Sequence, residues 1–506
     1  MVEIKLDNVN CKIMGELSSD FVKALDAKMS YDHPGYGFMS GARGGYGSAG
    51  KNGGWDGKVR LLTKAGRFPI GLLSIAEELL KESNIEYKVI DGRKTPDYGD
   101  PIPLIDASFE PRRYQSEAIK NSIGKGSGII KVATGGGKSF ILASIVAKYN
   151  IPTVVYVIGI ELLHQMKKTI ESAYGIECGI VGGGECDTSK PITIMTIWSA
   201  ASAFNKKIKV TDNDTTSDSK KHIQALNKAS VRRLVQDAQL FMFDECQYAA
   251  SETLQFIHRA SVSARHRFLL SGTPWRDTGD DILIEAVAGP RVVDVSATYL
   301  IKKGYLVPPN IVFLDVPVMR RVGKTYHDVY RNYIVENEDR NNLIIKAAKK
   351  LIKEGRKLLI LVVRVSHGER LLEELSKDYR AKFLDGAKAS KARLGAIEEM
   401  KRGDLDLLIA SKIFDQGIDI PELDALILAG SGKSSGRALQ RIGRVIRKSD
   451  GKKKAVVIEF LDNCKYLRDH SEARMKVYES EPGFRMKIHK NVAIRTYPKR
   501  PPVKWI

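Results

Sequence analysis

The stretch Ala133-Thr-Gly-Gly-Gly-Lys-Ser139 decides how the rest of the chain is interpreted. It follows the apolar run Gly128–Val132 and precedes the helix-like run Phe140–Ala147. A glycine loop between a strand and a helix turns backbone N–H groups onto phosphate oxygens, and the helix N-terminus adds a favourable dipole. We expect Lys138 to reach the β- and γ-phosphates of a nucleotide and Ser139 to ligate Mg²⁺. The alternative is an ordinary glycine-rich turn before a helix.

The apolar runs on either side of this loop predict a parallel α/β fold. From about residue 110, short β-branched runs alternate with helix-like segments, as in sheets built from strand–helix–strand units. The expected strands of this first series are Gly128–Val132, Thr153–Ile158, Ile192–Met195, Leu240–Phe243 and Phe268–Leu270. A second mixed α/β series follows from about residue 300.

Two adjacent acids, Asp244 and Glu245, directly follow the expected strand Leu240–Phe243. This position puts their carboxylates at the carboxyl edge of a parallel sheet, where ligands bind. We expect Asp244 to hold Mg²⁺, and Glu245 to orient and deprotonate an attacking water. Paired acids after a strand can also form a solvated turn, but the upstream phosphate loop favours the catalytic interpretation.

The charge balance indicates a polyanionic partner. The chain has 81 Lys and Arg against 60 Asp and Glu, a net charge of +21. Such an excess is typical of proteins that bind nucleic acid, although a merely basic enzyme is the alternative. Residues 444–506 hold 17 basic and 7 acidic residues, and Tyr497 and Trp505 lie among the last cations. The last 22 residues, Arg485–Ile506, contain seven basic residues and no acid. We expect this basic tail either to contact phosphates and bases or to form a solvated, partly disordered segment.

Several classes of protein are excluded by composition. The five cysteines are scattered and contain no Cys-x-x-Cys pair, which argues against a zinc ribbon and a disulfide framework. The longest apolar runs, such as Leu358–Val363, are far shorter than the ~18 residues that span a membrane. The first residues carry two acids and no long apolar core, so we predict no signal peptide.

The order of these motifs resembles that of the superfamily 2 helicases of the DExH type. Motif I of that family resembles Ala133–Ser139, motif II resembles Asp244–Gln247, and the eight residues Gln440–Arg447 closely resemble motif VI. Other resembling segments occur in the family's order, namely Pro111–Gln115, Glu161–Gln165, Thr196–Trp198, Leu270–Pro274, Leu358–Gly368 and Ser411–Asp419. The resemblance covers roughly residues 105–450.

This resemblance implies two RecA-like lobes that clamp ATP and Mg²⁺ between them. It implies that Gln115 reads adenine, and that Arg444 and Arg447 act as arginine fingers at the γ-phosphate. Their spacing of three residues would place both arginines on one helix face. The implied nucleotide-binding residues are Gln115, Thr134, Gly135, Gly136, Gly137, Lys138, Ser139, Gly417 and Asp419. The implied catalytic residues are Lys138, Asp244, Glu245, Arg444 and Arg447, and the candidate nucleic-acid contacts are Gln165, Trp198, Arg364 and His367.

One position departs from the family's pattern. Motif II usually ends in His, and this chain has Gln247 there. Glutamine can both donate and accept hydrogen bonds, so we expect polar coupling to the second lobe to survive.

A narrower resemblance concerns the N-terminal region. Trp55–Leu62 and Phe68–Leu72 look like the accessory domain of the UvsW-type phage helicases, and Ile334–Asn341 and Leu361–Gly368 extend that likeness to the motor. The likeness implies action on branched DNA in replication and recombination, namely fork reversal, branch migration and R-loop removal. Trp55 is the candidate for stacking on a base pair at a junction, or else it anchors the core of the small domain.

The expected organisation is therefore an α/β protein with a small α+β accessory domain at residues 1–102. The RecA-like lobes are expected at residues 103–300 and 301–506, with an insertion loop at Lys206–Ser230. We expect ATP and Mg²⁺ as cofactors and branched or forked DNA as partner, with no zinc and no membrane. We also expect a cytoplasmic location, in a host cell if the chain is phage-encoded, and favour a monomer.

Three other functions compete with this interpretation. An RNA helicase of the same superfamily would contact mainly phosphates and would show the same motifs. The motor of a restriction system is a second alternative, but we find no nuclease signature. The third is a strand-annealing or binding module with weak ATPase activity, against which the intact set of Lys138, Asp244, Glu245 and Arg447 argues.

Overall fold

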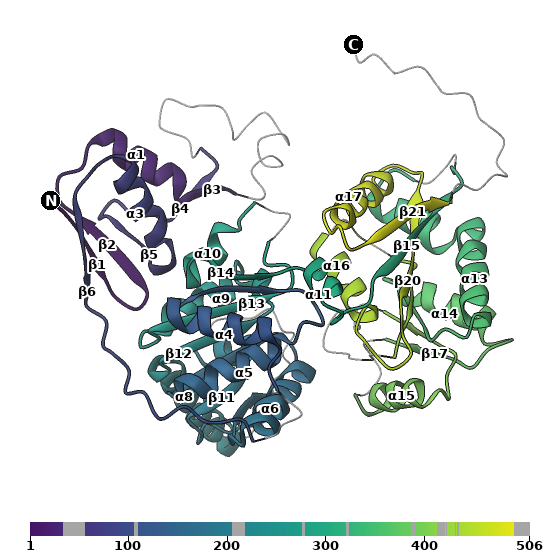
Figure 1. The fold of residues 1–506 in the computed structure, drawn as a ribbon, viewed down its shortest axis with the longest axis horizontal. Coiled ribbons are helices and arrows are strands. Elements are labelled where there is room, and N and C mark those ends of the chain that lie inside the picture. Colours follow the sequence, from purple (N-terminus) through teal and green to yellow (C-terminus); the bar gives the residue numbers. More distant parts are fainter. Residues whose placement is uncertain are drawn as a thin grey trace, which may run out of the picture. The chain divides into compact units, whose positions relative to one another are not determined.

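The computed structural model divides the chain into two compact units, Met1–Ser296 and Ala297–Ile506 (Figure 1). Each unit is described separately below. The residues that the structure describes are 1–33, 56–105, 110–204, 218–275, 279–319, 323–385, 390–411, 420, 422–430, 432 and 435–489.

The first unit begins with a small α+β region, as predicted. Its four strands are ordered β5-β2-β1-β6, and β1 pairs parallel with β6 and antiparallel with β2. Helices α1 (Ser19–Lys28) and α3 (Leu73–Glu82) supply a buried apolar face to this sheet. The strands are β1 (Val2–Leu6), β2 (Asn10–Met14), β5 (Arg67–Pro69) and β6 (Tyr87–Asp91), with a separate hairpin of β3 (Ser30–Asp32) and β4 (Lys58–Arg60).

The rest of the first unit is built on an eight-stranded sheet with the order β10-β9-β11-β8-β12-β13-β7-β14. All the pairings are parallel except that of the short β10 with β9, and the five strands predicted here are confirmed. The strands are β7 (Gly128–Val132), β8 (Thr153–Val157), β9 (Gly179–Gly182), β10 (Glu185–Cys186), β11 (Ile192–Thr196), β12 (Leu240–Asp244), β13 (His266–Ser271) and β14 (Arg291–Val295).

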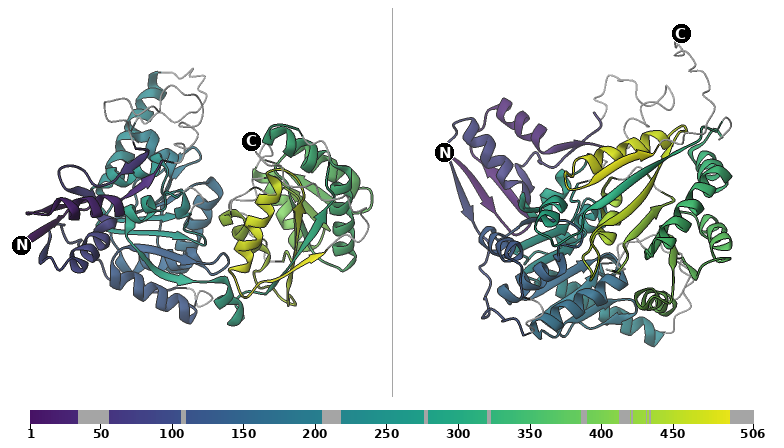
Figure 2. Two further views of the ribbon diagram at one scale, coloured as in Figure 1. Left: turned by 90° about the horizontal axis from the view of Figure 1, so that it is seen from above. Right: turned by 45° about the vertical axis from the view of Figure 1, so that its right-hand side comes forward.

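Helices cover both faces of this sheet, which explains why its central strands are apolar throughout (Figure 2). They are α4 (Arg113–Lys125), α5 (Lys138–Tyr149), α6 (Ile160–Tyr174), α7 (Ile197–Ala203), α8 (Asp218–Asp237), α9 (Glu252–Ala260) and α10 (Ile282–Ala288). The prediction of a loop at Lys206–Ser230 is wrong for its second part, because α8 begins at Asp218. The side chains of Val231 and Val235 bury one face of α8 in the apolar core. These contacts with residues distant in sequence stabilise a helix whose composition is mostly polar.

The small sheet is packed firmly against the large one. Arg267 of β13 is fully buried and donates from Nε and Nη2 to the carbonyl oxygen of Asn8, at 3.1 and 2.8 Å. Burial lowers the pKa of this guanidinium to about 9. Gly71, in the 3₁₀ turn Ile70–Leu72, approaches α10 so closely that a Cβ atom there would lie 1.9 Å from the carbonyl oxygen of Glu285. The two sheets therefore form one continuous body.

The segment that joins the two sheets is held on the surface of the larger one by His266. The Nδ1 atom lies 2.7 Å from the carbonyl oxygen of Gly126, which can only accept, so Nδ1 carries the proton. The Nε2 atom then accepts from the hydroxyl of Tyr98 at 2.8 Å. The ring of Tyr149 lies 4.3 Å from the His266 ring and completes the contact. Burial is the main reason why the pKa of His266 falls to about 4.

This arrangement predicts acid sensitivity of the first unit. The pKa of His266 is lower in the folded state than its unfolded value of about 6.5. This group therefore contributes its full stabilisation above pH 6.5, and the contribution is lost as the pH falls towards 4. We expect wild type to lose up to about 3 kcal/mol from this group over that window. Thermal unfolding at pH 7 and pH 5 should show a smaller drop for His266→Gln than for wild type. The exposed His164→Gln variant should behave as wild type, and equal drops for all three proteins would contradict the prediction.

The second unit contains a seven-stranded sheet in which all the pairings are parallel, with the order β17-β18-β16-β19-β20-β15-β21. This confirms the predicted second α/β series. The strands are β15 (Pro309–Val316), β16 (Leu358–Leu361), β17 (Ala381–Leu384), β18 (Leu407–Ala410), β19 (Ala425–Leu428), β20 (Ala455–Asp462) and β21 (Arg485–His489). The basic tail thus begins with an ordered edge strand, β21, and residues 490–506 lie outside the described part.

The helices of the second unit complete its two outer layers. They are α11 (Ala297–Lys302), α12 (Tyr326–Val329), the π-helical turn η4 (Tyr330–Val335), α13 (Glu338–Lys353), α14 (Val365–Leu375), α15 (Ser390–Arg402), α16 (Ser435–Val445) and α17 (Leu467–Glu479). No helix in the described ranges of either unit has the length and apolar character needed to cross a membrane.

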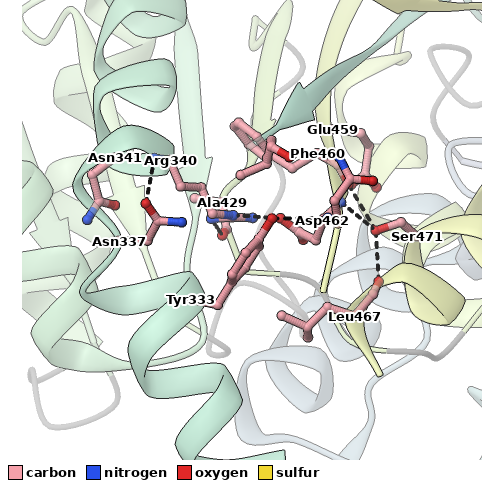
Figure 3. Close-up of polar contacts among 12 residues, drawn as sticks. Tyr333, Asn337, Arg340, Asn341, Ala429, Glu459, Phe460, Asp462, Leu467 and Ser471 are labelled. Atoms are coloured by element: carbon pink, nitrogen blue, oxygen red, sulfur yellow. Dashed lines mark hydrogen bonds and ion pairs between the residues drawn. The ribbon is translucent and has the colours of Figure 1, made fainter. Parts of the chain in front are cut away.

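A buried polar network ties α13 to the sheet of the second unit (Figure 3). Arg340 is 1% exposed and donates from Nε to Asp462 Oδ1 at 2.9 Å and from Nη1 to the carbonyl oxygen of Ala429 at 2.6 Å. Its guanidinium also lies over the ring of Phe460 at 4.4 Å. A second buried pair joins Arg474 of α17 to Glu459 of β20, with Nε and Oε1 3.1 Å apart.

Candidate active site

The glycine loop joins the end of β7 to the start of α5, as the sequence predicts. Gly135 and Gly137 have φ values of 87° and 76°, which side chains rarely allow. The N–H of Gly136 donates to the carbonyl oxygen of Ala133 at 2.9 Å and closes the turn. Lys138 is the first residue of α5, so its side chain lies at the N-terminus of that helix. This geometry suits a bound phosphate group.

Helix α4 supports the loop from outside. The hydroxyl of Tyr114 donates to the carbonyl oxygen of Gly136 at 2.7 Å, and Gln115 Nε2 donates to the same oxygen at 3.3 Å. The other end of the Gln115 amide accepts from the N–H of Arg112 at 2.9 Å. Gln115 thus contacts the phosphate loop directly, and its role in reading adenine stays a prediction. Tyr114 was not singled out from the sequence, although it stands beside Gln115 in a recognised motif.

The two acids lie at the carboxyl end of β12, next to β13 and β8. Asp244 is 6% exposed, and burial is the largest cause that raises its pKa, to about 7. The charge of Glu245 raises this pKa further, whereas the charge of Lys138 lowers it. Lys138 of the loop and the acids of β12 are therefore electrostatic neighbours. A buried carboxylate beside a second acid supplies oxygen donors that suit Mg²⁺, and the hydroxyl of Ser139, the second residue of α5, is a further candidate donor.

Glu245 has a strained backbone, with φ and ψ of 68° and 55° in the left-handed region. Its N–H donates to Asp244 Oδ1 at 3.0 Å, which fixes the two carboxylates relative to each other. Gln247 Nε2 donates to Glu245 Oε2 at 2.8 Å. Gln247 therefore holds a carboxylate oxygen of its own motif, and its polar coupling to the second lobe stays a prediction.

A hydrogen-bonded chain continues from Gln247 into the loop after β13. The hydroxyl of Ser271 donates to Gln247 Oε1 at 2.7 Å, and the N–H of Thr273 donates to Ser271 Oγ at 3.0 Å. The same loop touches the phosphate loop, since a Cβ atom on Gly272 would lie 3.0 Å from Thr134 Oγ1. Ser271 and Thr273 lay within a recognised motif, but only the structure shows that they connect two parts of the site.

Two candidate nucleic-acid contacts lie on helices that start at the same edge of the large sheet. Gln165 is exposed on α6, which follows β8, and Trp198 is 46% exposed at the start of α7, which follows β11. The side chain of Thr196 caps α7 by accepting from the N–H of Ser199. An exposed tryptophan at this edge is available for stacking. The third candidate in this part of the chain, Trp55, lies outside the described residues.

In the second unit the two candidate contacts differ sharply. Arg364 is exposed after β16, but His367 is fully buried. The Nε2 atom of His367 lies 2.9 Å from Asn341 Oδ1, and burial is the main cause that lowers its pKa to about 3. The structure thus corrects the assignment of His367, because its ring belongs to the core and is not accessible to a nucleic acid.

The candidate arginine fingers are both half-buried, but they are not on one helix. Arg444 lies in α16, which ends at Val445, and Arg447 lies beyond it in an isolated bridge with Leu306. The N–H of Val307 donates to the carbonyl oxygen of Ile446 at 2.9 Å, and this pairing ends the helix earlier than the spacing predicted. Gly417 and Asp419 lie outside the described residues.

Two family models match separate parts of the chain. The model described as type III restriction enzyme, res subunit, matches residues 108–276, and the model described as helicase conserved C-terminal domain matches residues 342–449. Together they cover more than half of the chain. The first range contains seven of the eight strands of the large sheet in the first unit, and the second contains four of the seven strands of the sheet in the second unit.

Curated relatives and solved structures extend these matches. The DNA 3'-5' translocase XPB2 of Sulfurisphaera tokodaii is 28% identical over 421 residues, which are 76% of this chain and 87% of that protein. The ATP-dependent DNA helicase uvsW of Enterobacteria phage T4 is 23% identical over 439 residues, which are 81% and 82% of the two chains. The structure of S. cerevisiae Dbp5 bound to RNA and ADP BeF3 has a TM-score of 0.53, with 13% identity, over 75% of this chain and 90% of that one, and shows a shared fold. The fold, the motif order and these matches identify the chain as a superfamily 2 helicase related to UvsW.

Proposed function

We propose that this helicase couples ATP hydrolysis to movement along DNA and that its preferred substrates are branched. One observation carries the ATP-hydrolysing part of the proposal. The phosphate loop, the acids after β12 and the loop after β13 meet at one edge of the large sheet, joined through Gln247 and Ser271. This set of groups fits phosphoryl transfer to water, in which positioning and charge stabilisation supply most of the catalysis.

Each group has a separate role in this proposal. Lys138 binds the phosphates, and Glu245 orients a water molecule and takes its proton as the water attacks the γ-phosphorus. Ser139 and Asp244 would hold Mg²⁺, which, when bound, neutralises charge on the phosphate oxygens. Arg444 and Arg447 of the second unit are proposed to stabilise the charge on the γ-phosphate during hydrolysis. The remaining proposed nucleotide contacts are Gln115, Thr134, Gly135, Gly136, Gly137, Gly417 and Asp419.

The hydrogen-bonded chain from Thr273 to Glu245 provides a route for coupling. A change at the γ-phosphate would alter the position of Glu245, and Gln247 and Ser271 would transmit it to the loop after β13. Such a connection would link hydrolysis to a change in the grip on the strand.

Three observations support DNA as the partner. The chain has a net charge of +21, Trp198 is exposed at the same sheet edge as the phosphate loop, and the relatives above are named as acting on DNA. The preference for branched DNA rests on the resemblance of Trp55–Leu62 and Phe68–Leu72 to an accessory domain. Gln165, Trp198, Arg364 and Trp55 are the proposed contacts.

ATP hydrolysis with different nucleic acids tests the proposal. The purified chain should hydrolyse ATP slowly alone and faster with single-stranded, forked or four-way-junction DNA, and it should unwind forked DNA and R-loops. Lys138→Ala is the inactive control. Stronger stimulation by duplex RNA than by any DNA would instead support an RNA helicase. A chain that anneals strands without measurable hydrolysis would contradict the proposal.

Arg447→Ala is expected to separate nucleotide binding from hydrolysis. An arginine finger typically contributes about 10³-fold or more to the rate of phosphoryl transfer, and it acts on charge that develops during the reaction. The variant should therefore bind a fluorescent ATP analogue as wild type does, while its single-turnover hydrolysis falls by about that factor. Arg402→Ala, which removes an exposed guanidinium of α15, should hydrolyse ATP normally. Undiminished hydrolysis by Arg447→Ala would remove this residue from the catalytic site.

A further inference from the structure

The second unit contains a cavity of about 330 Å³ whose lining includes none of the proposed nucleotide-binding residues. Arg364 and Arg441 of this lining fall within recognised motifs, and Arg364 is already a proposed nucleic-acid contact. Residues of α12, η4, α16, α17 and the end of β16 line it. They include Tyr326, Tyr330, Arg364, Arg437, Arg441 and Arg474, and none of the described residues lining it is acidic. Neither proposed arginine finger lines the cavity. A concave site with several cations and aromatic rings favours an anionic ligand that also has a flat ring.

The cations of the cavity fall into two groups. Arg441 and Arg474 are buried at its base, and Arg474 is paired with Glu459. Arg364 and Arg437 are exposed, and neither has an ion-pair partner within the described part of the chain. Their planar guanidinium groups can each bind a phosphate through two hydrogen bonds. The rim of the cavity is therefore suited to phosphate, whereas Arg474 at its base is held by Glu459.

The aromatic side of the cavity is also preorganised. The ring of Tyr326 is 43% exposed and lies 6.0 Å from Tyr330, 6.1 Å from Tyr466 and 5.7 Å from His470. Tyr466 packs edge-on against Tyr326 at 71°, and its backbone has φ and ψ of 66° and −41°. A non-glycine residue in such a conformation costs about 1–3 kcal/mol. The backbone strain at Tyr466 therefore lies next to the exposed ring of Tyr326.

A third feature indicates a ligand inside the cavity. Tyr330 is 5% exposed, and its hydroxyl is buried without a hydrogen-bond partner among the described residues. The charges of Arg340 and Asp462 act on Tyr330. Figure 3 shows that Arg340 and Asp462 are paired with each other. A buried hydroxyl that lacks a partner is costly, and a polar ligand atom would remove that cost.

We propose that this cavity binds one unstacked nucleotide of the strand held by the motor. The base would stack on Tyr326, the adjoining phosphate would bind Arg364 and Arg437, and Tyr330 would donate or accept a hydrogen bond inside the cavity. Such a site would hold one base out of the stack while the motor steps. The inference rests on the proposed function and adds a base-binding site on the second unit to it. A free mononucleotide has the same chemistry, so the experiment includes both.

The stacking part is tested with single-stranded oligodeoxynucleotides that each carry 2-aminopurine at one position, mixed with the full chain without ATP. In wild type, binding should change the fluorescence of one position more than that of its neighbours. The position-specific change should be lost in Tyr326→Ala and kept in Tyr326→Phe. We expect Tyr326→Ala to bind the strand about tenfold more weakly. Equal affinity and equal fluorescence changes for Tyr326→Ala and wild type would overturn the proposal.

The phosphate part is tested by the salt dependence of binding. Losing one phosphate contact should reduce the slope of log affinity against log salt by about 0.7 for a single strand. We expect this reduction for Arg437→Ala and not for the control Arg402→Ala. Adenosine monophosphate should compete with the strand only weakly. If it binds in a Tyr326-dependent way while the strand affinity of every variant is unchanged, the cavity is a mononucleotide site and the proposal is wrong. If wild type binds no strand at all, the proposed function fails first.

Discussion

Glu245→Gln is expected to reduce the rate of ATP hydrolysis by about 10²- to 10⁴-fold, the range typical for loss of a general base. The amide has the size of the carboxylate and keeps an oxygen that can accept from Gln247 Nε2. In wild type this nitrogen lies 2.8 Å from Glu245 Oε2. It cannot take a proton from the attacking water. The loss should therefore appear in the chemical step while nucleotide binding is retained.

Single-turnover phosphate release and binding of a fluorescent ATP analogue separate these two effects. Lys138→Ala is expected to lose both, because its charge contacts the phosphates before and during the reaction. Glu117→Gln, which neutralises an exposed acid of α4, should match wild type in both assays. Normal turnover by purified Glu245→Gln would show that another group activates the water.

Arg340→Met is expected to destabilise the second unit by about 3–5 kcal/mol, because it leaves the buried carboxylate of Asp462 without its partner. Arg340 Nε lies 2.9 Å from Asp462 Oδ1, and the two side chains are 1% and 6% exposed. The substitution also removes the donor to the carbonyl oxygen of Ala429 and the contact with the ring of Phe460. Chemical denaturation of the full chain should show the transition of this unit at a lower denaturant concentration.

A double substitution distinguishes the effect of the uncompensated charge on stability from the effect of lost packing. Asp462→Asn combined with Arg340→Met removes both charges, so it should be more stable than Arg340→Met alone. If the double variant is as unstable as the sum of the two single variants, the ion pair contributes no coupling and packing explains the whole effect.

The sequence by itself determined the parallel α/β fold and the place of the candidate nucleotide site. Strands buried on both faces appear as continuous apolar runs, and each of the five runs expected in the first series is a strand in the large sheet. The phosphate loop and the acids Asp244 and Glu245 could be located because their chemistry resides in contiguous residues at strand ends. Such local patterns need no knowledge of distant contacts.

Only the tertiary structure decided which of the predicted groups are exposed and how the site is connected. The position of His367 shortly after a strand predicts an accessible side chain, but packing against Asn341 places it in the core. Arg447 lies outside α16 because Leu306 and Val307, distant in sequence, pair with the residues around it. The chain from Thr273 to Glu245 crosses between neighbouring strands. Each of these features depends on contacts between segments far apart in the sequence, and local periodicity and spacing do not encode such contacts.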